Sequence, residues 1–304
     1  MRPLELGLPL PTIRLPMNDG ANRWSNIRGF AQRAEEMGFD TLWLPDELLW
    51  KFDPESEPIG TWECVAMAGA TAAVTERVNV GTWVLSALHR NPGLSVKVAQ
   101  AIDEISGGRF LFGFGAGHSG TQGKAFGYPP DKVVGRYEEA LEIVIPAIRE
   151  GTATYSGQYH SAFEQDNVPR GPSGSDMAVV LAGHGPRTIG LAVKYADIWS
   201  GYATESSQPE AFVNMLALVD SVCDQQGRDS ATLGKSIGVF VELTEASVVA
   251  ETGLGVPLRG GPSEMAEAVH RFAEMGVTML EMIPAPFNDE SMDRFAEMIE
   301  ILDS

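Results

Sequence analysis

Several ionisable side chains of this 304-residue sequence follow short apolar runs, where a folded chain exposes them at the ends of strands. Asp46 and Glu47 come just after Thr41–Leu44, and His118 follows Phe110–Phe114 and a run of glycines. A carboxyl group whose pKa is raised by burial can act as a general acid or base. A histidine titrates near neutrality and can do the same. Glu47 and His118 are therefore candidate acid–base residues, and a solvated carboxylate and a structural histidine are the simpler alternatives.

Residues 115–120 match G-x-G-x-x-G, the dinucleotide-binding fingerprint. The match is weak because that motif must lead directly into a helix whose N-terminus binds the pyrophosphate. Pro129 and Pro130 follow within ten residues, and residues 123–128 have no helical periodicity. We expect these glycines instead to let a flat ligand approach the backbone closely at the end of a strand.

Residues 182–187 form a second glycine-containing segment, at the start of an expected helix. Gly183 and Gly185 can expose backbone N–H groups, and a helix N-terminus attracts anions through these groups and its dipole. Arg187 adds a positive charge to an acidic chain. The segment therefore suits a phosphate group, and a tight turn without a ligand is the alternative.

Composition excludes several other functions. The net charge of −19 disfavours nucleic-acid binding, which needs a basic face. Cys64 and Cys223 lie far apart, so the sequence predicts neither a disulfide framework nor a metal site. The first residues are too short in apolar character for a signal peptide, and no run reaches the roughly 18 apolar residues of a membrane span. We expect a cytoplasmic protein without membrane partners.

The elements that must position these residues alternate along the chain as apolar runs and amphipathic stretches. Strands are expected at 4–8, 41–44, 78–85, 110–114, 178–181, 198–201, 236–241 and 278–283. Helices are expected at 22–37, 62–74, 94–105, 137–149, 187–195, 212–222, 265–275 and 292–302. This alternation predicts parallel strands. We expect one (β/α)8 barrel domain over residues 1–304, with an open doubly wound sheet as the competing fold.

Local signals refine these expectations. Gly38 lies where a helix C-cap belongs, Ser263 is a plausible N-cap, and Pro146 predicts a kink or early end of its helix. One helix is expected to bury a face made by Leu94, Val98, Ala101, Ile102 and Ile105.

Three long connections also stand out. Those at 46–61 and 116–135 follow strands and belong at the C-terminal rim, whereas 152–176 contains a small hairpin with a Ser-Gly turn.

The chain resembles the luciferase-like monooxygenase family in an ordered set of segments that covers nearly its whole length. These segments are 38–47, 80–85, 107–117, 136–141, 181–186 and 276–282. The resemblance implies a barrel that binds FMN or the deazaflavin coenzyme F420, with the ring across the strand ends and the phosphate at the loop after strand five. It also implies a non-proline cis peptide at Trp83–Val84. The implied cofactor-binding residues are Asp46, Thr82, Trp83, Val84, Gly115, Ala116, Gly117, Ala182, Gly183, His184, Gly185 and Arg187.

One departure from the family pattern concerns the acid–base residues. F420-dependent relatives typically carry Asp-His where this chain has Asp46 and Glu47, and often a glutamate where it has His118. A Glu47/His118 pair would reverse that order while keeping one acid and one base across the site.

The resemblance therefore predicts an F420-dependent oxidoreductase that exchanges a hydride with a small organic substrate. The alternatives are an FMN-dependent monooxygenase, a non-catalytic flavin- or deazaflavin-binding protein, and a barrel lyase or isomerase. A homodimer through the second and third helices is a family-level expectation.

Overall fold

Eight parallel strands of the described chain close into a barrel, because β10 pairs with β7 as well as with β11. The computed structural model describes residues 2–14, 22–51, 55–118, 120–202, 205–244 and 255–304. The barrel strands are β1 Glu5–Pro9, β2 Thr41–Leu44, β5 Asn79–Thr82, β7 Phe110–Gly115, β10 Ala178–Ala182, β11 Ile198–Tyr202, β12 Gly234–Glu242 and β14 Met279–Pro284. Closure rules out the open doubly wound sheet and confirms the predicted barrel.

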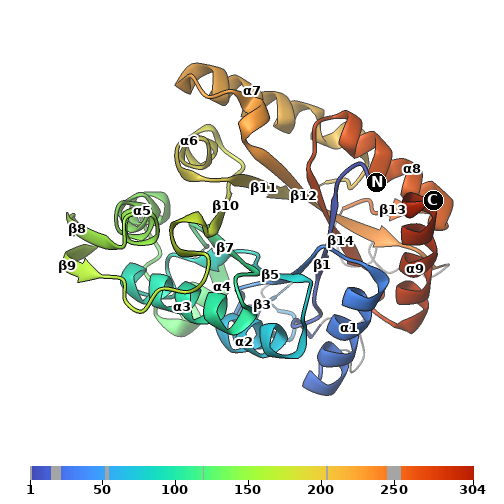
Figure 1. Cartoon of the computed structure of the whole chain (residues 1–304), viewed down its shortest axis with the longest axis horizontal. Coiled ribbons are helices and arrows are strands. Elements are labelled where there is room, and N and C mark those ends of the chain that lie inside the picture. The colour runs from blue at the N-terminus through green and yellow to red at the C-terminus, as the bar shows by residue number, and fades with distance from the viewer. Residues whose placement is uncertain (1, 15–21, 52–54, 119, 203–204, 245–254) are drawn as a thin grey trace.

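Helices surround this barrel (Figure 1). They are α1 Trp24–Met37, α2 Cys64–Val74, α3 Pro92–Ser106, α4 Gly120–Phe126, α5 Val133–Arg149, α6 Pro186–Tyr195, α7 Val213–Gln226, α8 Pro262–Glu274 and α9 Asp289–Asp303. Short 3-10 helices occur at Gly174–Asp176, Pro209–Phe212 and Ser230–Thr232. Among the described residues, no helix has the length and apolar character that crossing a membrane requires.

The remaining strands belong to the connections. β3 Leu49–Trp50 and β4 Ile59–Gly60 form an antiparallel pair in the connection after β2. β6 Leu85–Ser86 pairs in parallel with β7, and β13 Leu258–Arg259 pairs in parallel with β12. β8 Thr152–Ser156 and β9 Ser161–Asp166 form the predicted hairpin, which packs along α5.

Two tryptophans fill part of the barrel interior, because glycines on neighbouring strands leave room for their rings. A Cβ added at Gly7 would lie 2.6 Å from Trp43 Nε1, and one at Gly81 would lie 2.2 Å from Trp43 Cζ3. A Cβ at Gly238 would lie 2.4 Å from Trp83 Cζ2. These close approaches need glycine, whose side chain is a single hydrogen.

The predicted buried face of α3 is wrong in part. Leu94 and Ile105 are 53% and 51% exposed, whereas the polar side chains of Gln100 and Asp103 are buried. The reason is tertiary: Gln100 accepts a hydrogen bond from Gly171 N at 2.6 Å, and Asp103 accepts from Ser173 N at 2.9 Å. The connection before β10 therefore covers a face that hydrophobic periodicity alone assigns to solvent.

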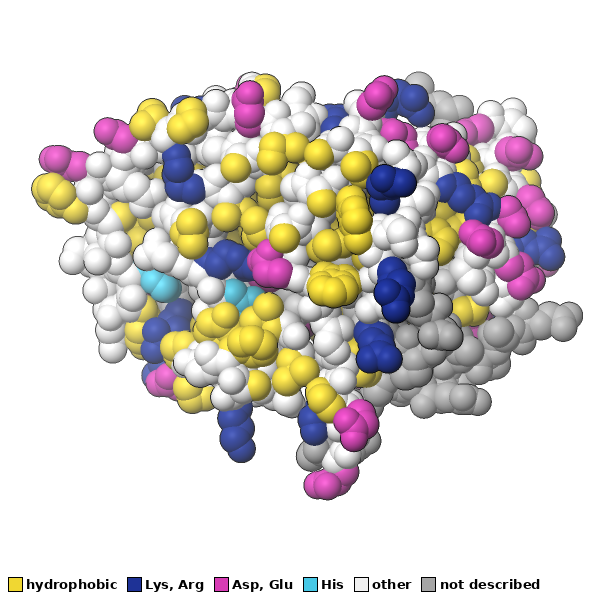
Figure 2. Space-filling view, turned by 90° about the horizontal axis from the view of Figure 1, so that it is seen from below, with side chains coloured by type: hydrophobic (Ala, Val, Ile, Leu, Met, Phe, Trp, Pro, Cys, Tyr) yellow, Lys and Arg dark blue, Asp and Glu magenta, His cyan; other side chains and the backbone are white. Residues whose placement is uncertain are grey.

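Large apolar side chains are exposed beside α2 and on α3. Trp62, just before α2, is 51% exposed, and on α3 Leu94 is 53% and Ile105 51% exposed. Figure 2 shows hydrophobic side chains gathered over the middle of the face seen from below, the side on which Figure 1 places α2 and α3. We call Trp62, Leu94 and Ile105 the α2–α3 apolar surface.

Several local expectations need correction. Ser263 is not an N-cap, since α8 begins at Pro262 behind Gly261, and proline suits the first helical position. α5 continues through Pro146 to Arg149, so the predicted early end is wrong. α4 is a helix in a segment expected to have none, and its contacts with β3 supply the stability that periodicity lacks. By contrast, Gly38 caps α1 in the left-handed conformation, as expected.

Candidate active site

The candidate residues lie at the carboxyl end of the barrel. Asp46 and Glu47 follow β2, His118 follows β7, and residues 182–187 span the end of β10 and the first turn of α6. Because the barrel strands are parallel, all these ends open on the same face.

Glu47 and His118 are in direct contact although they are 71 residues apart. His118 Nε2 lies 3.0 Å from Glu47 Oε1 and 3.1 Å from Oε2. The hydrogen bond to Glu47 raises the pKa of His118 and outweighs the opposite effect of burial. The His118 side chain is 53% exposed, so solvent or a ligand can reach it. The two candidate acid–base residues therefore form one proton-sharing pair.

Gln122 of α4 gives His118 a second partner. The buried Gln122 amide accepts a hydrogen bond from Leu48 N at 2.9 Å, which fixes its NH2 group 3.1 Å from His118 Nε2. A protonated Nε2 can donate to Glu47, and an unprotonated Nε2 can accept from Gln122. His118 thus has a hydrogen-bond partner in each protonation state.

Asp46 precedes Glu47 in the chain, and its side chain has no exposed surface. Its carboxylate accepts from Ser86 N at 2.8 Å, from Arg90 at 2.6 and 3.1 Å, and contacts His89 Nδ1 at 3.1 Å. Burial favours the neutral acid, but the hydrogen bonds from His89 and Arg90 prevail and lower the pKa of Asp46. Arg90 also pairs with Glu63, which caps α2. Asp46 therefore fixes the segment after β6, and contact with a cofactor stays a prediction.

Gly113 and Gly115 of β7, and Gly117 just after it, lie against the segment from β5 to β6. A Cβ at Gly113 would lie 1.8 Å from Thr82 O, one at Gly115 would lie 2.6 Å from Val84 Cγ2, and one at Gly117 would lie 2.0 Å from Ser86 Oγ. On the Cβ side they make room for the segment from β5 to β6. The expectation that Gly115 and Gly117 let a flat ligand approach stays a prediction.

That segment contains the predicted non-proline cis peptide at Trp83–Val84. The buried Thr82 hydroxyl bonds to the backbone of Gly113 in β7, donating to its O at 2.8 Å and accepting from its N at 3.1 Å. The Trp83 indole donates to Ser200 Oγ at 3.0 Å across the barrel.

Ala116 is half-buried. Ala182 Cβ would lie 3.8 Å from a Cβ at Gly115, so the ends of β7 and β10 adjoin here.

The N-terminus of α6 has free backbone N–H groups, but that of Gly183 is not among them. Gly183 N donates to Ser200 O at 3.2 Å and is therefore committed to the sheet. The N–H groups of Gly185, Arg187 and Thr188 have no acceptor among the described residues, and Gly185 provides no side-chain cap. A Cβ at Gly185 would meet nothing within 4 Å. The backbone here is open to an anion.

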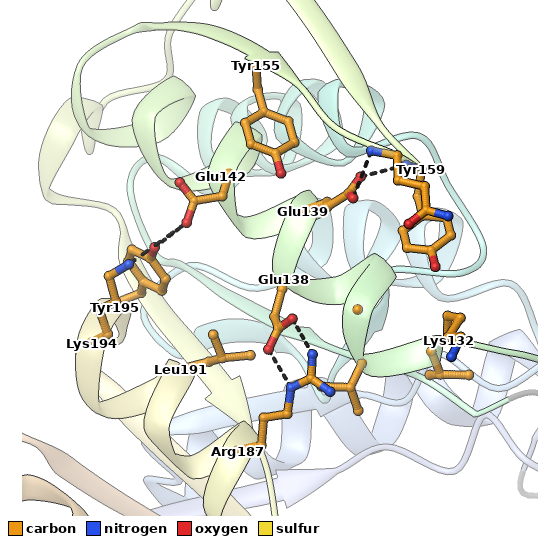
Figure 3. Close-up of a pocket in the computed structure, with 14 residues that line it drawn as sticks. Lys132, Glu138, Glu139, Glu142, Tyr155, Tyr159, Arg187, Leu191, Lys194 and Tyr195 are labelled. Carbon is orange, nitrogen blue, oxygen red and sulfur yellow. Dashed lines mark hydrogen bonds and ion pairs between the residues drawn. The ribbon is translucent and has the colours of Figure 1, made fainter.

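Arg187 and His184 complete this rim. Figure 3 shows the Arg187 side chain reaching from α6 to Glu138 of α5, to which it donates at 2.6 and 2.5 Å. Arg187 is therefore already neutralised and does not point at the open backbone. The His184 ring packs edge-on against Tyr202 at 4.3 Å, and burial lowers its pKa. His184 Nε2 accepts a hydrogen bond from Tyr202 N at 3.4 Å, which a neutral ring can do.

The groove in Figure 3, about 970 Å³ in volume, lies outside the barrel between α5, α6 and the β8–β9 hairpin. Its charges pair with one another: Glu138 with Arg187, and Glu142 with Lys194 at 3.8 Å. Glu139 accepts from three backbone N–H groups of the hairpin turn. We therefore take the barrel mouth, not this groove, as the candidate active site. Among the described residues, no cluster of potential metal ligands occurs.

Three residues that support the candidate site were not among the predicted site residues. His89 and Arg90 hold Asp46, and Gln122 holds His118. Gln122 lies in α4, and His118 precedes that helix by two residues. Recognising α4 would have pointed to it.

Known proteins resemble this chain over most of its length. The family model described as luciferase-like monooxygenase matches residues 5–278. An F420-dependent glucose-6-phosphate dehydrogenase from Microbacterium testaceum is 30% identical over 67% of this chain and 60% of its own length. A 5,10-methylenetetrahydromethanopterin reductase from Archaeoglobus fulgidus is 27% identical over 74% of this chain and 60% of its own length. The chain thus matches about 60% of the length of these two relatives.

Solved structures share the fold. An F420-dependent secondary alcohol dehydrogenase, in complex with an F420–acetone adduct, has a TM-score of 0.79 at 17% identity, covering 99% of both chains. A monooxygenase from Streptomyces bottropensis has a TM-score of 0.77 at 17% identity, covering 99% of this chain and 100% of its own.

Proposed function

The chain belongs to the luciferase-like monooxygenase family, and on that premise we propose that it is an F420-dependent oxidoreductase. In this proposal a hydride passes between the deazaflavin and a small organic substrate. The observation that carries it is the contact between Glu47 and His118, an acid–base pair at the open end of the barrel. Relatives that use F420, at 30% identity and below, support this cofactor.

The structure offers a fit for a cofactor of the F420 or flavin type. An anionic phosphate group needs free donors, and the open backbone at Gly185, Arg187 and Thr188 supplies N–H groups. A flat ring needs a platform, and the Trp83–Val84 segment forms the adjoining surface at the strand ends. We propose that these residues hold the phosphate and the ring, respectively.

Bound F420 would supply the hydride acceptor or donor, and the chain would supply the proton transfer and orientation. When a hydride leaves or joins a substrate carbon, the attached heteroatom must lose or gain a proton. His118 Nε2 can hold or release that proton, because Glu47 partners the protonated form and Gln122 the unprotonated form. Asp46 takes no proton in this scheme; it holds the segment 86–90 against the site.

The first experiment titrates the purified protein with F420 and, separately, with FMN, and follows absorbance. Saturable binding of F420 without FMN binding would support the proposal. FMN binding without F420 binding would favour the monooxygenase alternative. Binding of neither would refute a cofactor role of the barrel mouth.

The second experiment tests the acid–base pair against a substrate panel. His118→Gln should reduce turnover while leaving F420 binding intact, since the residue acts on the proton rather than on the cofactor. His270→Gln, at an exposed position of α8, is the matched control. Cofactor binding with no turnover of any substrate would favour the non-catalytic alternative.

We further propose that two copies pair through the α2–α3 apolar surface. Exposed large apolar side chains on adjoining helices favour burial against another protein. Light scattering should report a dimer that Leu94→Lys converts to a monomer. An unchanged mass would refute this interface.

Both cysteines are free and buried, which supports a reducing compartment such as the cytoplasm.

A further inference from the structure

Glu281 of β14 carries a carboxyl group inside the barrel, with no exposed surface. In register it lies between Gly7 of β1 and Gly238 of β12. Trp43 occupies the space beside Gly7, and Trp83 occupies the space beside Gly238. The carboxyl group is therefore enclosed among the rings of the barrel interior, one of which belongs to the segment at the barrel mouth.

A row of hydrogen-bonding side chains leads from this carboxyl group to the mouth, and its longest step, 3.5 Å, lies between two serine hydroxyls. Ser236 Oγ donates to Glu281 Oε1 at 2.5 Å and lies 3.5 Å from Ser200 Oγ. The Trp83 indole donates to Ser200 Oγ at 3.0 Å. An indole N–H can only donate, so the Ser200 hydroxyl is free to donate to Ser236, and Ser236 to Glu281. Every donor in the row then points toward Glu281.

Among the residues that the structure describes, no cation acts on Glu281 to hold it ionised. The titratable group that acts on it is Glu5 of β1, which carries the same charge. On β12, Lys235 pairs with Asp220, and Glu242 pairs with Arg259. Burial raises the pKa of Glu281 to about 8, the bond from Ser236 counteracts this in part, and Glu5 adds to it. The other oxygen, Oε2, has no protein partner in the described structure.

We propose that Glu281 holds a proton inside the barrel and, through Ser236 and Ser200, acts as a positioning residue for the Trp83 indole. When Glu281 loses its proton, it becomes a stronger acceptor, because hydrogen bonds to an ionised group are shorter and stronger. Through Ser236 and Ser200, the hydrogen bond from the Trp83 N–H to Ser200 Oγ then becomes stronger. The consequence for the cofactor rests on the proposed function: the same titration alters the surface that receives the ring.

The experiment follows the indole N–H resonance of Trp83 in apo protein labelled with nitrogen-15 tryptophan, assigned with Trp83→Phe. We expect this resonance to shift with pH, with a midpoint near the Glu281 pKa of about 8. Glu281→Gln should abolish the shift because an amide does not titrate. Ser200→Ala should also abolish it, because it breaks the row while leaving Glu281 in place. Ser95→Ala, which removes a buried serine hydroxyl on α3, should keep it.

A second readout is the infrared carbonyl stretch of a protonated carboxylic acid. Wild-type apo protein should have this band at neutral pH, and Glu281→Gln should lack its Glu281 component. A Trp83 resonance that does not titrate, or that titrates equally in Ser200→Ala, would overturn the proposal. If Glu281→Gln does not fold, the pH titration of the Trp83 resonance in Ser200→Ala still tests the proposal. Because these measurements use apo protein, failure of F420 and FMN to bind would refute the proposed function and leave the Glu281–Trp83 coupling standing.

Discussion

The buried carboxyl group of Glu281 should make the stability of the protein depend on pH in a calculable way. Its pKa is about 8 in the folded chain, against an ordinary value of 4.5. Between these values the folded state keeps a proton that the unfolded state has lost, so the free energy of unfolding falls as pH rises. The slope is about 1.4 kcal/mol per pH unit. The accumulated loss is about 5 kcal/mol by pH 8, with little further change above it.

Glu281→Gln removes this titration, so the comparison of the two proteins isolates it. Urea unfolding at a series of pH values should give a wild-type minus Glu281→Gln difference that falls by about 1.4 kcal/mol per pH unit from about pH 5 to 8 and then levels. Any constant effect of the amide cancels in this slope. Glu290→Gln, at an exposed position of α9, controls for removing one negative charge from a chain of net charge −19. A difference that stays flat, or that rises with pH, would refute the assignment of a buried proton to Glu281.

Three further predictions concern the site and its supports. Glu47→Gln should lower the pKa of His118 toward its ordinary value of 6.5, because the hydrogen bond to Glu47 is what raises it; imidazole NMR titration measures this, and an unchanged value would contradict the pairing. Asp46→Asn should cost about 3–5 kcal/mol in urea unfolding, since it leaves the guanidinium of Arg90 without its buried carboxylate, and a loss below about 1 kcal/mol would argue against that role. Glu138→Gln should tighten binding of a phosphate-bearing cofactor by up to about tenfold, because it frees the exposed Arg187 from its ion pair; equal affinity would mean that Arg187 does not reach the phosphate.

The sequence predicts the barrel well because periodicity is a local property that the fold preserves. β2 has the predicted bounds, and Gly38 caps α1 as expected. Contacts between distant residues are not encoded in this local pattern. The neighbours of Gly113 and Gly117 are Thr82 of β5 and Ser86 of β6, about 30 residues earlier, and they lie close because both strands pair with β7. Spacing alone therefore does not reveal that Ser86 occupies the room beside Gly117.

For the candidate site too, the sequence predicts which residues lie at the strand ends but not which partners their side chains contact. Strand ends place Glu47 and His118 on one face, and the structure brings them into contact. The direction of a long side chain depends on partners that a strand pattern does not identify, so Arg187 reaches Glu138 rather than the open backbone of α6. Glu281 reads as one more residue of a buried strand. Its chemistry becomes apparent only when Ser236 and Ser200 are seen beside it.

Asp46 and Glu47 are joined by one peptide bond yet belong to separate bonding networks. The first is buried and binds the frame of the barrel, and the second meets its partner at an accessible rim. A substitution at Glu47 therefore removes the contact with His118 and leaves the hydrogen bonds of Asp46 to Ser86 and Arg90 in place. One peptide bond thus separates a position that can vary from a position that anchors the rim of the barrel.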